Sequence, residues 1–194
     1  MATTATSLAA TPQTAAAAAP CASGPNGSAS QSGQSGKETS PPGDIPDNQA
    51  FVLYSPPSGG YSIKVPEGWA RTDEQQAVTF TDKFNAVRVE LTPASQAPTV
   101  ESARAAEVPP LAATVPCFRA GNVSTATRRA GTAVVVTYQA DGPSDPVTGK
   151  AVREDVERFE FWRNGTEAVI TLSGPAGSDN VDPWRIVTDS FAWR

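Results

Sequence analysis

The chain has 194 residues and a net charge of −5, and its 18% charged and 39% hydrophobic residues are both below the globular average. It contains no histidine, which excludes Ser-His and Cys-His nucleophile pairs and nearly every zinc site. Because the charge balance is acidic and no basic run is longer than Arg128-Arg129, we expect no nucleic-acid partner.

Residues 1–48 differ from the rest in composition. They are mostly Ala, Gly, Ser, Pro and Thr, and every aromatic residue lies between Phe51 and Trp193. Such a segment buries too little apolar surface to offset the entropy lost on ordering. We therefore expect a disordered signal remnant and tether over 1–48, whose removal leaves stability unchanged. Residues 49–194 are enough for one domain with its own core.

Cys21 is the candidate site in the N-terminal segment. Small, weakly apolar residues from Leu8 to Pro20 precede it, and a Gly/Ser/Pro-rich stretch follows it. This resembles the junction of a bacterial lipoprotein and implies that Cys21 is lipidated, with the protein extracytoplasmic and held to the cell membrane by this anchor alone. No Lys or Arg occurs before Lys37, so we expect the basic start of a signal peptide further upstream.

Other interpretations of this segment stay open. In one alternative the protein is secreted without a lipid, and in the other it is cytoplasmic and the segment is an Ala/Thr-rich tail. No stretch reaches the roughly 20 apolar residues of a transmembrane helix. A Cys21–Cys117 disulfide is a further alternative, which we do not expect because it would tie a disordered tail to the domain.

The domain opens with four segments of strand character. Ala50–Ser55 and Tyr61–Val65 are separated by a Pro/Gly turn cluster. Around 78–80 and 87–91, apolar residues alternate with polar ones, which predicts half-buried strands. Because short turns join the four segments, they predict an antiparallel meander.

A helix and four more strands come next. Thr99 predicts a helix N-cap, and Pro109-Pro110 is expected to end or kink this helix. Asn164-Gly165 predicts a type I′ hairpin between the last two strands. The four strands are expected near residues 118–126, 133–140, 155–163 and 167–173.

A short helix closes the chain. Asp182 is its expected N-cap and Pro183 its first residue, and Trp184, Val187 and Phe191 share one face. The order of strands, helix, strands and helix contains no βαβ crossover. It predicts an α+β fold in which helices flank an antiparallel β-sheet.

Two segments resemble a known family. Residues 61–69 (YSIKVPEGW) resemble the strand–turn–Trp opening of PsbP-like domains, and residues 182–193 (DPWRIVTDSFAW) are similar to the closing helix and tail of bacterial lipoproteins of this type, including the LpqN-like mycobacterial ones. The resemblance implies a PsbP-like α/β/α sandwich over 49–194, of the actinobacterial lipoprotein type. It also implies a small binding or assembly module without catalytic residues.

The densest acidic stretch supplies candidate carboxylates. A pair of them would suit glycoside hydrolysis. Their alternation with Arg158 and large apolar residues is instead typical of a solvated sheet face with cross-strand ion pairs, so we assign them no catalytic role. The four residues are Glu154, Asp155, Glu157 and Glu160.

Three other features have structural explanations. Residues 142–151 place Ala151 where a phosphate loop has Ser or Thr, and they predict a hairpin loop. Asp141 and Asp145 lack EF-hand spacing, so they would form only a weak calcium site. We interpret Cys117 as a partly buried structural cysteine.

These observations predict a protein that is not an enzyme, with no catalytic residue, cofactor or metal. We expect a monomeric, envelope-tethered module that docks onto or helps assemble another envelope protein. The alternative is a small-molecule or lipid carrier with an apolar cleft, which needs a cavity of about 300 Å³ or more. A hydrolase that works without histidine is the third interpretation.

Overall fold

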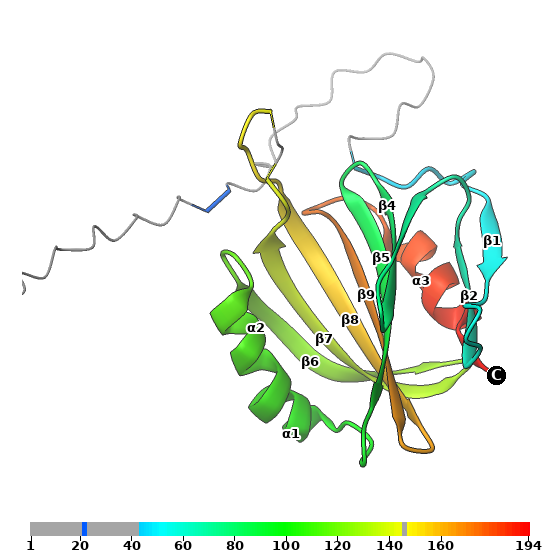
Figure 1. Cartoon of the computed structure of the whole chain (residues 1–194). Coiled ribbons are helices and arrows are strands. Elements are labelled where there is room, and N and C mark those ends of the chain that lie inside the picture. Colours follow the sequence, from blue (N-terminus) through cyan, green and yellow to red (C-terminus); the bar gives the residue numbers. More distant parts are fainter. Residues whose placement is uncertain (1–20, 23–42, 145–146) are drawn as a thin grey trace, which may run out of the picture.

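The computed structural model describes residues 21–22, 43–144 and 147–194, so most of the predicted signal remnant and tether lies outside the described residues. The fold has three layers (Figure 1). A seven-stranded antiparallel sheet lies between a helical layer on one face and, on the other face, a single helix beside a three-stranded sheet. None of the helices in the described ranges is long and apolar enough to cross a membrane.

The strands form two antiparallel sheets. The small sheet has the order β1 (Phe51–Tyr54), β2 (Tyr61–Pro66) and β10 (Ala192–Trp193). The large sheet has the order β3 (Ala70–Asp73), β4 (Ala77–Asp82), β5 (Asn85–Pro93), β9 (Thr166–Pro175), β8 (Arg153–Arg163), β7 (Gly131–Asp141) and β6 (Arg119–Arg128).

The predicted α+β class is confirmed, but the single opening meander is wrong. After β2 the chain turns at Gly68, whose φ is +84°, and enters the large sheet. The early strands are therefore divided, with β1 and β2 in the small sheet and β4 and β5 in the large one. Asn164 and Gly165 both have positive φ values, 49° and 84°, and they join β8 to β9 in the expected hairpin.

The helical layer consists of α1 (Val100–Ser102), the π-helical turn η1 (Ala103–Glu107) and α2 (Val108–Thr114). Thr99 caps it as predicted, since Thr99 Oγ1 accepts a hydrogen bond from the Ser102 N–H at 3.0 Å. Pro109 and Pro110 do not end the helix. They lie in the first turn of α2, where the backbone N–H groups have no partner within their own helix to lose.

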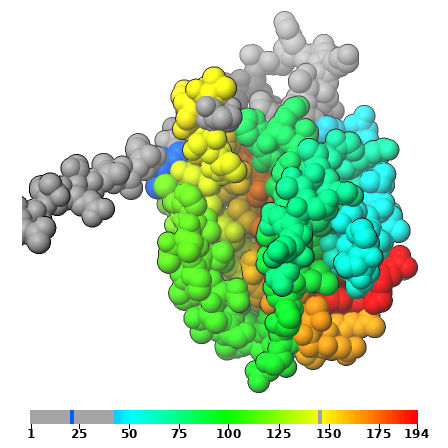
Figure 2. All heavy atoms as spheres, in the orientation of Figure 1, coloured from blue at the N-terminus to red at the C-terminus, as the bar shows by residue number. Residues whose placement is uncertain are grey.

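The final helix, α3 (Val181–Ser190), covers the opposite face of the large sheet. Its N-cap position is Asn180 rather than Asp182, which lies in the first turn. Since strand side chains alternate between faces, the odd-numbered residues of β7 and β8, such as Val135 and Phe159, pack toward α3, while even-numbered ones such as Val134 pack beneath the helical layer. Figure 2 shows the surface hollowed between the helical layer and strands β4 and β5.

The packed region starts at Gly43 rather than at the predicted boundary, Gln49. Ile45 is only 4% exposed and belongs to the core that packs against α3. Its N–H donates to Asn180 Oδ1 at 2.8 Å, and the Gly43 carbonyl accepts a hydrogen bond from Asn85 Nδ2 at 3.0 Å. Composition could not reveal this contact, because it depends on one isoleucine in an otherwise polar segment.

Candidate binding groove between helix α3 and strand β6

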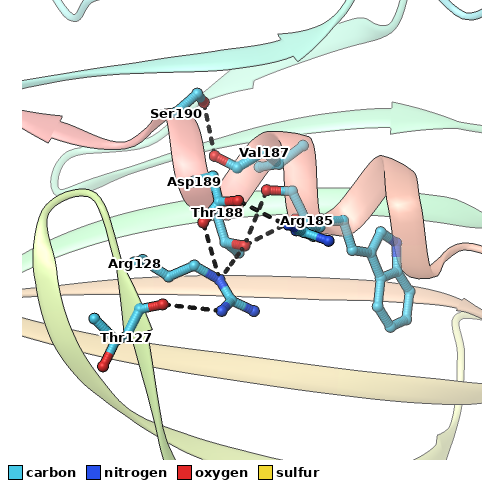
Figure 3. Close-up of polar contacts among 8 residues, drawn as sticks. Thr127, Arg128, Arg185, Val187, Thr188, Asp189 and Ser190 are labelled. Atoms are coloured by element: carbon cyan, nitrogen blue, oxygen red, sulfur yellow. Dashed lines mark hydrogen bonds and ion pairs between the residues drawn. The ribbon is translucent and has the colours of Figure 1, made fainter.

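The C-terminal ends of α3 and β6 are held together by Arg128 (Figure 3). Its Nε donates to Thr188 Oγ1 at 3.0 Å and lies 3.5 Å from Asp189 Oδ1. The guanidinium carbon also lies 5.2 Å from the ring centroid of Phe159. Because Thr188 is fully buried and itself donates to the Trp184 carbonyl at 3.0 Å, this contact closes one end of the space between α3 and the sheet.

At its N-terminal end, α3 is separated from β6 by a groove of about 420 Å³. Strand β6 supplies one wall, α3 supplies the other, and β7 and β8 supply the floor. The polar and aromatic residues that line it include Arg119, Thr137, Gln139, Asp155, Glu157 and Trp184. Val181, 71% exposed, lies at the α3 rim.

The two carboxylates in the groove have different environments. Asp155 accepts hydrogen bonds from Gln139 Nε2 at 2.8 Å and from the Gly177 N–H at 2.9 Å. Glu157 is half-buried and has no hydrogen-bond or ion-pair partner among the described residues. Burial raises the pKa of the Glu157 carboxyl, with Arg128 opposing the rise and Asp155 adding to it. The groove therefore contains one satisfied and one unsatisfied acid.

The β6 wall of the groove carries an unused hydrogen-bond donor. Arg119 is exposed there and has no hydrogen-bond or ion-pair partner in the part of the chain that the structure describes. Trp184 also lines the groove, but its indole N–H is buried out of contact with solvent and finds no acceptor among the described residues. The groove thus offers a donor on one wall and an acceptor on its floor.

Asn180, which sequence reasoning missed, borders the groove at the start of α3. Besides binding Ile45, its side chain donates from Nδ2 to Asn85 Oδ1 at 3.0 Å. Gly174 makes room for this pair, because a Cβ there would lie 2.5 Å from Asn85 Oδ1 and 2.7 Å from Asn180 Nδ2. The sequence signal was a buried-strand glycine, which often marks a close approach of other groups.

Cys21, the predicted lipidation site, forms a disulfide with Cys117 in this structure. One sulfur atom cannot carry both a disulfide and a thioether-linked lipid, so the structure shows the alternative that we did not expect. The adjoining contacts explain why: the Ala22 N–H donates to Asp141 Oδ2 at 2.8 Å, and Arg153 Nη1 donates to the Cys117 carbonyl at 2.6 Å. Lipidation of Cys21 stays a prediction that requires a free thiol.

The weak calcium site suggested for Asp141 and Asp145 stays a prediction, because Asp145 lies outside the described residues. Asp141 itself is paired with Arg153, whose Nη1 lies 3.2 Å from Asp141 Oδ1.

The acidic stretch does not form the single solvated face that its alternation with Arg158 predicts. Asp155 and Glu157 point into the groove, whereas Glu154 and Glu160 lie on the even-numbered face. Glu160 is 1% exposed; Arg158 Nε donates to its Oε1 at 3.1 Å, while Oε2 has no partner among the described residues. Burial raises the pKa of Glu160 to about 7, against the lowering effect of Arg158. The alternation with arginine predicted a solvated face, but residues of β8 pack into a core cluster on each side of the sheet.

No protein-family model matches the chain, and no curated protein is detectably similar to it in sequence. Among solved structures, LpqN of Mycobacterium tuberculosis, described as involved in cell envelope biogenesis, is 14% identical with a TM-score of 0.46; the match covers 76% of this chain and 92% of LpqN. A protein from Bacteroides thetaiotaomicron VPI-5482 is 11% identical with a TM-score of 0.49; the match covers 73% of this chain and 48% of that longer one.

The cyanobacterial PsbP protein CyanoP of Synechocystis sp. PCC 6803 is 15% identical, with a TM-score of 0.52. The match covers 88% of this chain and all of CyanoP (100%). At this level of identity the likeness concerns the fold and not the activity. The chain therefore has the PsbP-like α+β fold that its opening and closing segments predicted.

Proposed function

We propose that the protein is a non-catalytic, extracytoplasmic module that acts as a monomer and docks onto another envelope protein through the groove between α3 and β6. The observation that carries the proposal is the set of unpaired polar groups in this groove. Glu157 on the floor and Arg119 on the β6 wall have no hydrogen-bond or ion-pair partners among the described residues. A partly desolvated carboxylate without a partner is unfavourable, and a bound partner can satisfy it.

The chemistry of the groove supports binding rather than catalysis. Its floor hydroxyl, Thr137 Oγ1, accepts a hydrogen bond from the Asn122 N–H at 2.8 Å, and Asp155 is held by two hydrogen bonds. A nucleophile needs an adjacent base, and no such pair is found among the lining residues that the structure describes.

The Cys21–Cys117 disulfide supports an extracytoplasmic location, because disulfides persist in oxidising compartments. If a lipid anchor is present instead, it occupies the sulfur of Cys21 and leaves Cys117 as a free thiol. Intact-mass measurement separates these states, since reduction of the disulfide adds only the mass of two hydrogen atoms.

The carrier alternative is favoured by one observation, the groove volume of about 420 Å³, which exceeds the roughly 300 Å³ expected for a small-molecule site. The groove is open and has a carboxylate on its floor, however, and the space between α3 and the sheet is filled by the aromatic rings of Phe161 and Phe191. A charged partner fits this surface better than a lipid.

Chemical cross-linking of cells that produce the protein, followed by mass spectrometry, tests the docking function. Val181→Asp places a charge at the groove rim, and Ile186→Asp is the matched control, since Ile186 is an exposed apolar residue of the same helix (42%) outside the groove. We expect one partner to be recovered with wild type and Ile186→Asp and lost with Val181→Asp. Recovery of no specific partner, or loss with both variants, would refute docking through this groove.

A further inference from the structure

Glu157 lies on β8 directly across from Thr137 of β7, so its carboxylate lies on the floor of the groove. It is partly desolvated, which raises its pKa, yet it has no hydrogen-bond or ion-pair partner among the described residues. Arg128, whose charge lowers the pKa of Glu157, is already bound to Thr188 and Asp189. A carboxylate in such a place gains most from a positive group brought in by a partner.

The unpaired groups around Glu157 define what else the partner must carry. Arg119 is an exposed donor on the β6 wall without a partner among the described residues. A single small cation would satisfy Glu157 but would not bind Arg119. An anion would bind Arg119 but would be repelled by the charge of Glu157.

The edge of the large sheet supplies the remaining constraint. Strand β6 is the last strand of that sheet, and its first three residues, 119–121, line the groove. Its register with β7 shifts between Ala120 and Val123, and the Val123 carbonyl is already bound by Arg104 Nη2 at 3.1 Å. The start of β6 is therefore the part of this edge that lies beside the groove, where a backbone in extended conformation can pair with it.

We propose that the groove binds an extended peptide segment of the docking partner, and that a Lys or Arg side chain of this segment pairs with Glu157. This rests on the proposed docking function and names the chemistry of its partner. The peptide backbone supplies carbonyl acceptors for Arg119 and for the start of β6, as extended peptides do at sheet edges. The basic side chain supplies the charge that complements Glu157.

Selection from a displayed library of random linear peptides tests this proposal with defined probes. We expect peptides selected on the wild-type protein to be enriched in Lys or Arg. In fluorescence titrations, synthetic versions should bind Glu157→Gln about tenfold more weakly, as expected for loss of a charge-assisted hydrogen bond. Glu67→Gln removes the same charge in an exposed turn outside the groove and should bind as wild type does.

Three results would overturn the proposal: no enriched peptides, enriched peptides without a basic residue, or equal affinity for wild type and Glu157→Gln. Thermal melts of Glu157→Gln establish that the variant is folded. The outcome is separable from that of the cross-linking experiment. If Val181→Asp abolishes partner recovery but Glu157→Gln binds the peptides normally, docking stands and the basic-peptide assignment fails.

Discussion

Gly174 is the residue on which the contact between the N-terminal segment and α3 depends most closely. A Cβ at this position would lie 2.5 Å from Asn85 Oδ1 and 2.7 Å from Asn180 Nδ2. Gly174→Ala should therefore push apart a hydrogen-bonded pair of buried side chains and lower the free energy of unfolding by about 1–3 kcal/mol. Urea titration measures this change, and an unaltered midpoint would contradict the packing described for Asn85 and Asn180.

Glu160 makes stability depend on pH. Its pKa is raised from 4.5 to about 7 by burial, with Glu107 of η1 and Glu167 of β9 adding to the rise and Arg158 opposing it. The folded state therefore holds a proton that the unfolded state releases, so stability is highest below about pH 4.5 for this group and falls as pH rises to about 7. The full effect is about 3 kcal/mol.

Denaturant titrations between pH 5 and pH 8 check this dependence. Glu160→Gln keeps the shape of the side chain but cannot ionise, so its free energy of unfolding should fall less than that of wild type over this range. Glu154, Glu157 and Glu167 also have raised pKa values because of burial, so some slope of the same sign remains. A wild-type stability that rises with pH would contradict the assignment.

Individual residues of the groove could not be found from the sequence. Asp155 and Glu157 were visible as acids, but the sequence could not reveal that Gln139 and Gly177 satisfy the first while the second stays unpaired. Such pairing depends on the register of β7 against β8 and on a loop from elsewhere in the chain. The absence of histidine, in contrast, excludes Ser-His and Cys-His nucleophile pairs without any knowledge of the structure.

At the scale of secondary-structure elements, the contact between β6 and α3 determines where the groove ends. Thr188→Val removes the hydroxyl that accepts a hydrogen bond from Arg128 Nε and keeps the branched shape. Because a guanidinium then loses a buried partner, we expect a loss of about 1.5–3 kcal/mol. Thermal unfolding of Thr188→Val and of wild type measures this loss. Ser190→Ala, a second variant at the same end of α3, is measured beside them. Equal stability of Thr188→Val and wild type would show that Arg128 does not hold α3.

Elements with strong local signals were predictable, and those set by tertiary contacts were not. Alternating apolar residues predicted β4 and β5, and Asn164-Gly165 predicted the β8–β9 turn. Strand β3, Ala-Arg-Thr-Asp, is fully exposed and forms only because β4 pairs with it. The expectation that Pro109 and Pro110 end the helix was wrong. The π-helical turn η1 precedes them and places them in the first turn of α2, and helix propensity does not reveal such a turn.

At the scale of the whole molecule, the disulfide links the start of the described chain to the loop after α2. It joins residues separated by 96 positions, and closing a loop of that size stabilises a fold by up to about 4–5 kcal/mol in the chain-entropy model. Reduction should therefore lower the melting temperature of the wild-type protein. The double variant Cys21→Ser, Cys117→Ser should melt at that lower temperature and be insensitive to reductant.

Truncation measures the contribution of residues 43–48 in the absence of the disulfide. In a Cys117→Ser background, a chain that starts at Gly43 keeps the burial of Ile45 and its hydrogen bond to Asn180. A chain that starts at Gln49 loses both and should be less stable by about 2–4 kcal/mol, the cost of removing a buried isoleucine. Equal stability of the two chains would restore the boundary predicted from composition.

Amide hydrogen exchange of the protein alone and bound to its cross-linked partner shows directly whether the groove is the docking surface. Docking through the groove predicts added protection in residues 119–121, in residues 155–157 and at the start of α3. The rival surface is β1, an edge strand with exposed Val52 and Leu53. Protection confined to β1, with the groove residues exchanging as in the free protein, would show that the partner does not dock through the groove.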